Sequence, residues 1–379
     1  MSFDLDLPFL YGCSFDFISN PSVIQRLYSK EYMFPRNPSY ATYESDENSR
    51  RLFAVTSSSG ESSDRASLIS DENVLILCKL LTSFLLLTFI KIPLFDKWYF
   101  SMDKPYLFFE NQDPSVSPNY SFIFDFERNF DIHLNIQWMN KHYHYVFYYI
   151  GLYLLVIFGV QAFMKNRSRF EVRKLLAAWN ILLATFSILG MSRTLPELVH
   201  VLTKFGFAYS VCNPSYMFEK VTAFWGWMFC YSKIPELFDT LFIVLRKQPL
   251  IFLHWYHHIT VLLFTWYANI YQVAAGRWYV AMNYFVHSWM YTYFALKSLR
   301  IKTPRIFALI ITFLQILQMI FGFYITYFSY VTIHKGEPCN QKTNIAISGL
   351  LMYGSYFVLF ARFFYYSYLS PPNKAKKSV

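Results

Sequence analysis

The amino-acid sequence predicts an all-α polytopic membrane protein, a bundle of seven transmembrane helices. Of its 379 residues, 55% are apolar and only 15% are charged, whereas about 25% are charged in an ordinary soluble domain. From residue 143 onward, apolar stretches alternate with short basic or polar loops, and each stretch is near the roughly 20 residues that a helix needs to cross a bilayer. No soluble core of this size shows such a pattern.

The N-terminal part of the chain has a different composition. Residues 1–73 are rich in Ser, Asp, Glu and Asn, and we expect them to form a disordered extension. Residues 74–118 form a hydrophobic segment and linker, in which 74–95 is long enough to span but contains Lys79, Lys91 and Pro93. This segment is either an extra N-terminal transmembrane helix or an amphipathic helix on the lumenal surface.

Seven predicted spans follow, at 143–164, 174–192, 219–245, 251–268, 278–298, 305–331 and 345–369. Lys and Arg are concentrated in the first, third and fifth loops between these spans and in the tail 372–379. Because short loops rich in Lys and Arg stay on the cytoplasmic side, these loops and the C-terminus are predicted to be cytosolic. The net charge of +10 therefore reflects membrane topology, and no nucleic-acid partner is expected.

The third span carries the sequence KIPELFDT, which contains Lys233, Glu236, Asp239 and Thr240. In a continuous helix these spacings place the side chains on one face, where the lysine could neutralise both carboxylates. Charged groups at bilayer depth are costly and are usually functional. The alternative is an ion-pair network that only stabilises the bundle.

The fourth span opens with HWYHHIT, which places His254, His257 and His258 within about 1.3 helical turns. Such a cluster could bind metal, or act as a nucleophile and general base. Membrane di-iron oxygenases use several HxxHH boxes, whereas this chain has one box among nine histidines. Counting ligands therefore argues against a metal site.

Polar residues of four spans are expected at one depth. Asp239 lies about 10 Å inward from Arg246, and His257 lies about 10 Å inward from Leu250, on antiparallel helices joined by a short cytosolic loop. The fifth and sixth spans add Asn283, His287, Tyr291, Gln315 and Gln318. The sequence therefore predicts an intramembrane polar site that opens to the cytosol. For the two glutamines, hydrogen bonding between helices is an equally good interpretation.

Taken in order, the motifs KxxExxDT, HxxHH, NxxxHxxMYxY and TxxQxxQ resemble those of the ELO family of very-long-chain fatty acid elongases. The resemblance covers 119–371, which would form a seven-helix elongase domain. It is greatest to the branch that elongates saturated and monounsaturated long-chain acyl-CoA, because Trp255 follows the first box histidine and Pro249 stands where polyunsaturated-chain elongases usually have Gln. One departure is Phe294, where many relatives have a second Tyr.

The resemblance implies that the bundle encloses an acyl tunnel and condenses acyl-CoA with malonyl-CoA, giving 3-oxoacyl-CoA, CO2 and CoA. It assigns His257 as the residue that takes the acyl group, with His287 beside it, while His254 and His258 orient it or stabilise developing negative charge. Cys230 is expected too deep in the membrane to serve as the acceptor. The remaining implied catalytic residues are Lys233, Glu236, Asp239, Asn283 and Tyr291.

The implied substrate-binding residues are Gln315, Gln318, Thr240, Arg246, Lys247, Lys302 and Arg305. The four basic ones are candidates for the CoA phosphates, or they only set topology. No metal or organic cofactor is required. The expected partners, besides membrane lipid, are a second copy in a homodimer and the ketoacyl-CoA reductase, dehydratase and enoyl-CoA reductase that complete the elongation cycle.

The ends and loops carry three further signals. The final residues KKSV match a dilysine retrieval pattern, which predicts residence in the endoplasmic reticulum membrane. Asn119 begins a glycosylation sequon on the predicted lumenal side. Cys212 and Cys339 fall in the second and sixth loops, both predicted to be in the oxidising lumen, and we expect them to form a disulfide rather than remain two free thiols.

A seven-helix receptor or transporter is the alternative function, with buried charges that bind a ligand or an ion. The histidine box argues against it, because a receptor needs neither three clustered imidazoles nor a charged face at matching depth. A transporter would more often show inverted repeats, which this sequence does not show.

Overall fold

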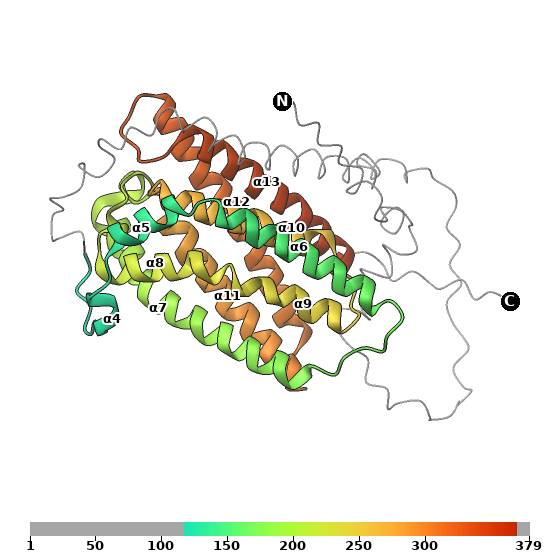
Figure 1. Cartoon of the computed structure of the whole chain (residues 1–379). Helices are drawn as coiled ribbons and strands as arrows, with labels where there is room; N and C mark the ends of the chain where they lie inside the picture. The colour runs from blue at the N-terminus through green and yellow to red at the C-terminus, as the bar shows by residue number, and fades with distance from the viewer. Residues whose placement is uncertain (1–116, 370–379) are drawn as a thin grey trace, which may run out of the picture. The chain divides into compact units, whose positions relative to one another are not determined.

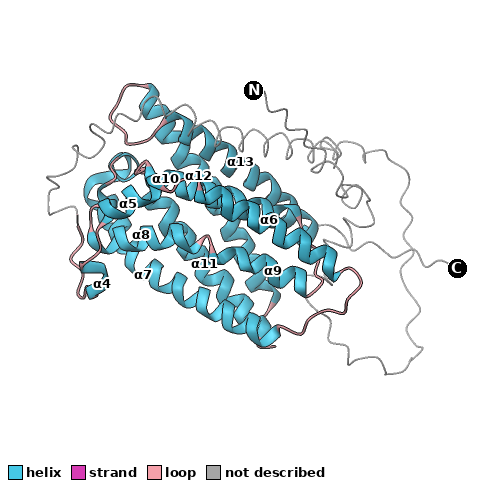
Figure 2. Cartoon of the chain, viewed as in Figure 1, coloured by secondary structure: helices cyan, strands magenta, loops and turns pink. Residues whose placement is uncertain are grey.

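The computed structural model describes residues 117–369, and the regular structure in that range is helical (Figures 1 and 2). The extension 1–73, the segment 74–95 and the tail 372–379 lie outside the described residues. The elements are α4 (Asp125–Arg128), α5 (Ile132–Lys141), α6 (Tyr145–Met164), α7 (Arg173–Cys212), η4 (Ser215–Met217), α8 (Lys220–Ser232), η5 (Pro235–Leu237), α9 (Phe238–Leu245), α10 (Phe252–Ile270), α11 (Gly276–Ser298), α12 (Arg305–His334), α13 (Thr343–Phe364) and the π-helix η6 (Tyr365–Leu369).

The all-helical membrane fold class is confirmed for the described residues. Four helical segments there are long and apolar enough to cross a membrane: α6, α7, α12, and α13 together with η6. The other expected spans coincide with α8 and α9, with α10 and with α11, which carry the buried polar residues and are therefore less apolar. The number of helices that cross the membrane stays a prediction.

Helix α7 continues well beyond residue 192, where the second span was expected to end. Its extension contains two charged side chains, half-buried Arg193 and buried Glu197, that pair with partners from distant parts of the chain. Arg193 binds Glu127 at 2.6 Å, and Glu197 binds Arg277 at 2.9 Å. Because each charge is neutralised, the chain stays helical past both of them. It then kinks at Gly206, whose φ of 82° only glycine adopts easily.

The third span is not one continuous helix. Helix α8 ends at Ser232, a 3-10 turn follows, and α9 begins at Phe238. Pro235 starts that turn, and proline has no backbone N–H to donate to the preceding helical turn. The break changes the helical register between Lys233 and Asp239, so the two side chains do not share the face that a continuous helix would give them.

The long helices pack into a closed ring. Helix α6 contacts α9, α8 contacts α7, and α7 contacts α11; contacts of α11 with α12, α12 with α13, α13 with α10 and α10 with α6 complete the circuit. Figure 1 shows these helices running side by side. Large apolar side chains such as Leu155, Phe313 and Phe321 are exposed on the outer surface, as expected for helices that face lipid. The buried polar residues face the inside of the ring, where they can form a functional site.

A disulfide bond lies at the end of the ring that we predict to be lumenal. Cys212, the last residue of α7, is bonded to Cys339, in the loop between α12 and α13. The backbone N–H of Asn340 also donates to the carbonyl oxygen of Cys212 at 2.9 Å. The carbonyl oxygen of Asn340 in turn accepts from the N–H of Ala274 at 3.0 Å. The expected cysteine pair is therefore present, within a hydrogen-bonded junction of three loops.

Candidate active site

A buried lysine lies at the centre of the polar network inside the ring. Lys233, only 2% exposed, directly follows α8. Its Nζ lies 2.8 Å and 3.0 Å from the two carboxylate oxygens of Glu236 and 3.1 Å from Oδ1 of Asn283 on α11. The Ser232 hydroxyl also donates to Glu236, at 2.9 Å. The network thus pairs a buried cation with a buried carboxylate and links α8 to α11.

Asp239 belongs to a second set of hydrogen bonds. Its Oδ1 accepts from the indole N–H of Trp179 at 2.6 Å, and its Oδ2 accepts from the hydroxyl of Tyr291 at 2.8 Å. The sequence-based expectation that Lys233 neutralises both carboxylates is therefore wrong for Asp239, because the turn at Pro235 separates the two positions. Asp239 instead connects α9 to α7 and α11 through neutral donors.

His287 lies between these two sets on α11. Its Nε2 is 3.2 Å from the amide nitrogen of Asn283, one helical turn earlier. Its other neighbour is Tyr291, whose ring packs against the imidazole edge to face, with the ring centres 5.3 Å apart. The Lys233–Glu236 pair therefore contacts His287 through Asn283, and Asp239 contacts it through Tyr291.

The three box histidines pack together on α10. The ring centres of His254 and His258 are 4.6 Å apart, and those of His257 and His258 are 5.6 Å apart. Nε2 of His254 lies 3.0 Å from the hydroxyl oxygen of Thr240, which is 2.8 Å from that of Tyr153. A hydrogen-bonded line from α6 through α9 to α10 thus orients the first box histidine.

Tyr356 of α13 holds the backbone beside the second box histidine. Its hydroxyl donates to the carbonyl oxygen of His257 at 3.2 Å and also contacts the hydroxyl of Thr260. Its ring centre is 5.0 Å from that of His257. The position of His257 is therefore set by α13 as well as by its own helix.

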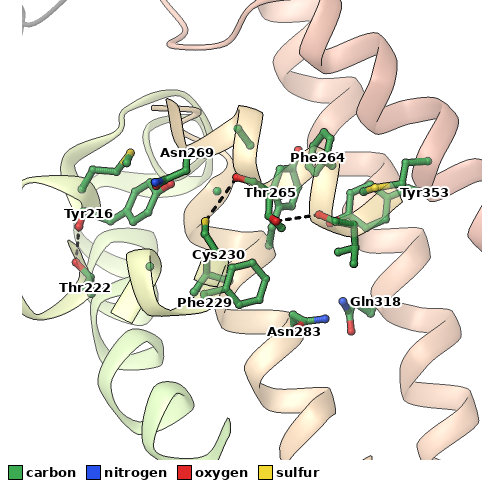
Figure 3. A pocket seen from close by; sticks show the side chains of 18 of the residues that line it. Tyr216, Thr222, Phe229, Cys230, Phe264, Thr265, Asn269, Asn283, Gln318 and Tyr353 are labelled. Atoms are coloured by element: carbon green, nitrogen blue, oxygen red, sulfur yellow. Dashed lines mark hydrogen bonds between the residues drawn. The ribbon is translucent and has the colours of Figure 1, made fainter. Parts of the chain in front are cut away.

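A narrow cavity inside the bundle is lined by His257 of α10, and Figure 3 shows other side chains that line it. The cavity has a volume of about 50 Å³. At one end it is lined by His257, Asn283 and Gln318, and at the other by Asn269 and Tyr216. Most of the lining between them is apolar: Ala223, Gly226, Phe229, Cys230, Val261, Phe264, Ala268, Val280, Met319 and Met352. His257 and Asn269 are about 18 Å apart along α10, so the cavity is a long apolar slot with histidine at one end.

Tyr216 of η4 lines the far end of the slot. Its hydroxyl donates to the carbonyl oxygen of Val273 at 3.0 Å, and its own carbonyl oxygen accepts from Thr222 (Figure 3). Gly276 makes this fit possible, because a Cβ there would collide with the tyrosine hydroxyl. The guanidinium of Arg277, which pairs with Glu197, also donates to the carbonyl oxygens of Ser210 and Asn213, just before η4 in the sequence. The end of the slot is therefore rigidly built.

The two glutamines of α12 differ in position. Gln318 lines the cavity, and Figure 3 shows its amide next to that of Asn283. Gln315 instead places its amide nitrogen 3.4 Å from the sulfur of Met290 on α11. The structure therefore brings only Gln318 to the slot, whereas Gln315 contributes to contact between helices.

The four basic candidates lie away from the slot, at the end of the bundle that we predict to be cytosolic. Arg246 is half-buried, whereas Lys247, Lys302 and Arg305 are exposed. The ammonium of Lys247 donates to the carbonyl oxygens of Lys165 and Arg167, at 3.1 Å and 2.9 Å. Lys247 thus ties the loop between α6 and α7 to the end of α9.

Several site residues could not be found from the sequence. Trp179, Tyr153 and Tyr356 each hold a motif residue from a different helix. They are aromatic residues in apolar spans, where such residues are common, and no spacing distinguishes them from their neighbours. The indole and phenol hydrogen-bonding groups were the available signal, since a buried Trp or Tyr usually finds a polar partner.

One remaining sequence-based candidate lies outside this cluster. Asn119 is exposed, in the segment before α4. Within residues 117–369, no group of three His, Cys, Asp or Glu side chains is arranged to hold a metal ion. Between residues 117 and 369 the free thiol is that of buried Cys230, which lies 3.5 Å from the carbonyl oxygen of Thr265 and lines the slot.

Comparison with known proteins gives consistent matches over the helical region. A family model described as ELO: GNS1/SUR4 family matches residues 138–376. The chain is 54% identical to very long chain fatty acid elongase 6 of Drosophila melanogaster over 265 residues, 69% of this chain and 84% of that protein. It is 45% identical to the protein of the same name from Gallus gallus over 254 residues, 67% of this chain and 96% of that protein. With very long chain fatty acid elongase 3 of Homo sapiens, identity is 41% over 225 residues, 59% of this chain and 83% of that protein.

Proposed function

The chain belongs to the ELO (GNS1/SUR4) family, and we propose that it is a fatty acid elongase that condenses long-chain acyl-CoA with malonyl-CoA. The products are 3-oxoacyl-CoA, CO2 and CoA, and the acyl group is carried by a histidine of the enzyme. The proposal extends to this chain the activity named in the matched relatives, very long chain fatty acid elongases.

The observation that carries the proposal is the position of His257 at the polar end of a long apolar slot. An acyl-CoA has a reactive thioester between a long apolar chain and a large polar head. A slot with imidazole at one end suits that shape, because the chain can be buried in apolar surroundings while the thioester lies among hydrogen-bonding groups.

In the first step, the lone pair of a His257 ring nitrogen attacks the thioester carbon. The C–S bond breaks and CoA leaves as the thiolate. The proton on the other ring nitrogen passes to that thiolate, so that a neutral acyl-imidazole and the CoA thiol remain. Cys230 is a poorer acceptor than His257, because it lies part-way along the slot and not at the end beside Asn283 and Gln318.

In the second step, malonyl-CoA loses CO2, and the electron pair of the broken C–C bond forms an enolate. The enolate carbon attacks the acyl-imidazole carbon and a C–C bond forms. The bond to the His257 nitrogen breaks, and the ring takes up a proton from water to become neutral imidazole again. Negative charge develops on the thioester and enolate oxygens, which N–H donors at this end of the slot would stabilise. His254, His258 and His287 are the proposed donors and orienting groups.

Neighbouring side chains supply the geometry of the step. Lys233 and Glu236 hold Asn283. Tyr291, whose hydroxyl donates to Asp239, packs against His287, and Thr240 orients His254. Gln318 is proposed to contact substrate in the slot, and Gln315 to support α12 against α11. Arg246, Lys247, Lys302 and Arg305 are the proposed contacts for CoA phosphates.

The cellular setting is part of the same proposal. The protein would reside in the endoplasmic reticulum membrane with a cytosolic C-terminus, so that CoA substrates reach the site from the cytosol. Asn119 would be glycosylated in the lumen. A homodimer that associates with the ketoacyl-CoA reductase, dehydratase and enoyl-CoA reductase would pass intermediates along the cycle.

The test is expression of the full chain in microsomes that lack other elongase activity. Radiolabelled malonyl-CoA is supplied with palmitoyl-CoA and without NADPH, so that the cycle stops after condensation. We expect label in 3-oxoacyl-CoA two carbons longer than the primer. Microsomes that contain the inserted protein but incorporate no label with any saturated or monounsaturated primer would contradict the proposal.

A further inference from the structure

Lys233 determines which way the side-chain amide of Asn283 points. A lysine ammonium has three N–H donors and no acceptor. The Asn283 atom that lies 3.1 Å from Nζ is therefore the carbonyl oxygen, as the structure has it. The other two ammonium donors are used by the two oxygens of Glu236. The lysine is thus held in place, and the NH2 group of Asn283 must point away from it.

The direction of that amide determines the protonation of His287. The NH2 nitrogen of Asn283 lies 3.2 Å from Nε2 of His287. Because an amide NH2 donates and does not accept, this hydrogen bond requires a lone pair on Nε2. A neutral imidazole with a lone pair on Nε2 carries its proton on Nδ1, and a doubly protonated ring cannot accept the bond at all.

We propose that Lys233, acting through Asn283, fixes His287 as the neutral tautomer with its proton on Nδ1. Lys233 and Asn283 are then positioning residues, and the ring they hold supplies an N–H donor, not a basic lone pair. This assigns different roles to two histidines of the site: His257 is the nucleophile and His287 is a hydrogen-bond donor to developing negative charge. The division of roles rests on the proposed condensation, whereas the tautomer does not.

The direct test is nitrogen NMR of the full-length protein in detergent micelles, labelled with 15N histidine and measured at neutral pH without substrate. The His287 signals are identified by their loss in His287→Gln. We expect a proton-bearing Nδ1 and a lone-pair Nε2, distinguished by their different couplings to the two ring carbon-bound protons. A proton on Nε2, or on both nitrogens, would overturn the proposal.

The substitution Asn283→Asp tests the link. A carboxylate only accepts hydrogen bonds, so it should hold the His287 proton on Nε2 while keeping the contact with Lys233. We expect the tautomer to reverse and malonyl incorporation to fall by about 100-fold or more. Ser288→Ala is the matched control. The buried Ser288 hydroxyl, on the same helix, donates to the carbonyl oxygen of Phe285 one turn earlier, so its removal should change neither readout. An unchanged tautomer in Asn283→Asp would contradict the proposal.

A second variant covers a failure of Asn283→Asp to fold. Lys233→Met with Glu236→Gln removes the donor that orients the amide without leaving a buried unpaired charge. We expect both His287 tautomers in the NMR spectrum, and retention of the single Nδ1–H form would show that Lys233 does not control it. A wild-type protein with the Nδ1 proton but no malonyl incorporation would instead contradict the proposed function and leave the tautomer assignment standing.

Discussion

At the scale of single residues, the two carboxylates of the site are stabilised differently. Glu236 faces an ammonium three residues away in the sequence, whereas Asp239 accepts from an indole and a phenol that are 60 and 52 residues away. The first pair could be predicted, because a spacing of three residues brings side chains together within one turn. The second could not, because its donors come from helices whose packing the local sequence does not encode.

The substitution His257→Ala should abolish condensation while the protein stays folded and membrane-inserted. It removes the proposed acyl acceptor, and alanine is well tolerated in a helix. Malonyl incorporation measures the activity, and the retained Cys212–Cys339 disulfide reports the fold. His334→Ala, which truncates an exposed histidine at the end of α12, should leave activity unchanged. Normal turnover in His257→Ala would contradict the covalent scheme.

At the scale of elements, hydropathy located the helices better than it located their ends. Expected and observed boundaries agree closely for α6, α10 and α11. The prediction failed where charges interrupt an apolar pattern, because Arg193 and Glu197 of α7 form ion pairs with residues elsewhere in the fold. It also missed the turn at Pro235, although proline inside a span is a recognised signal for a helix break.

The substitution Glu127→Gln should loosen the attachment of α4 to the bundle in a pH-dependent way. Burial acts to raise the pKa of Glu127, but hydrogen bonds from Arg193, Trp225 and the Phe124 backbone outweigh it and hold the pKa below its usual range. A lowered folded-state pKa stabilises the protein above the unfolded-state pKa, near 4.3 for glutamate, and this contribution is lost as the pH falls through the folded-state value.

Thermal unfolding of the wild type and Glu127→Gln, from pH 7 to pH 2, measures this effect. We expect the variant to be less stable by about 3 kcal/mol at neutral pH, with the gap narrowing at the acidic end. Asp125→Asn is the control, because that side chain is 90% exposed and such surface pairs contribute little. A gap of constant size across the pH range would argue against an ionised Glu127 as the source.

The substitution Tyr216→Ala should extend the slot at the end that Tyr216 lines. Removing the phenol opens space beside Gly276 and Val273, so the preferred saturated acyl-CoA should become longer. Malonyl incorporation is compared across primers of increasing length. Tyr327→Ala, which truncates a half-exposed tyrosine on the outer face of α12, should keep the wild-type preference. The same preference in both variants would show that Tyr216 does not close the acyl site.

At the scale of the whole molecule, loop charges and cysteine positions were enough to predict the disulfide. They placed Cys212 and Cys339 on one side of the membrane, and the structure bonds them. The slot itself could not be predicted, because its shape depends on how side chains from five long helices and η4 meet. The sequence indicated that an acyl tunnel should exist by resemblance alone, without showing which residues line it.

The substitution Cys339→Ser should lower the stability of the bundle. The disulfide closes a segment with a sequence separation of 127, and in the chain-entropy model a loop of that size contributes about 5 kcal/mol, an upper value. Thermal unfolding in detergent measures the loss, and Cys212→Ser should cause an equal one, as should the double variant. Additive losses from the two single variants would contradict the pairing.

The most direct test of the account is the mass of the protein after incubation with acyl-CoA alone. We expect an increase equal to one acyl group, localised to His257 by peptide mapping and released as 3-oxoacyl-CoA when malonyl-CoA is added. An acyl adduct on Cys230, or complete turnover through a protein that is never acylated, would contradict the central claim that His257 carries the growing chain.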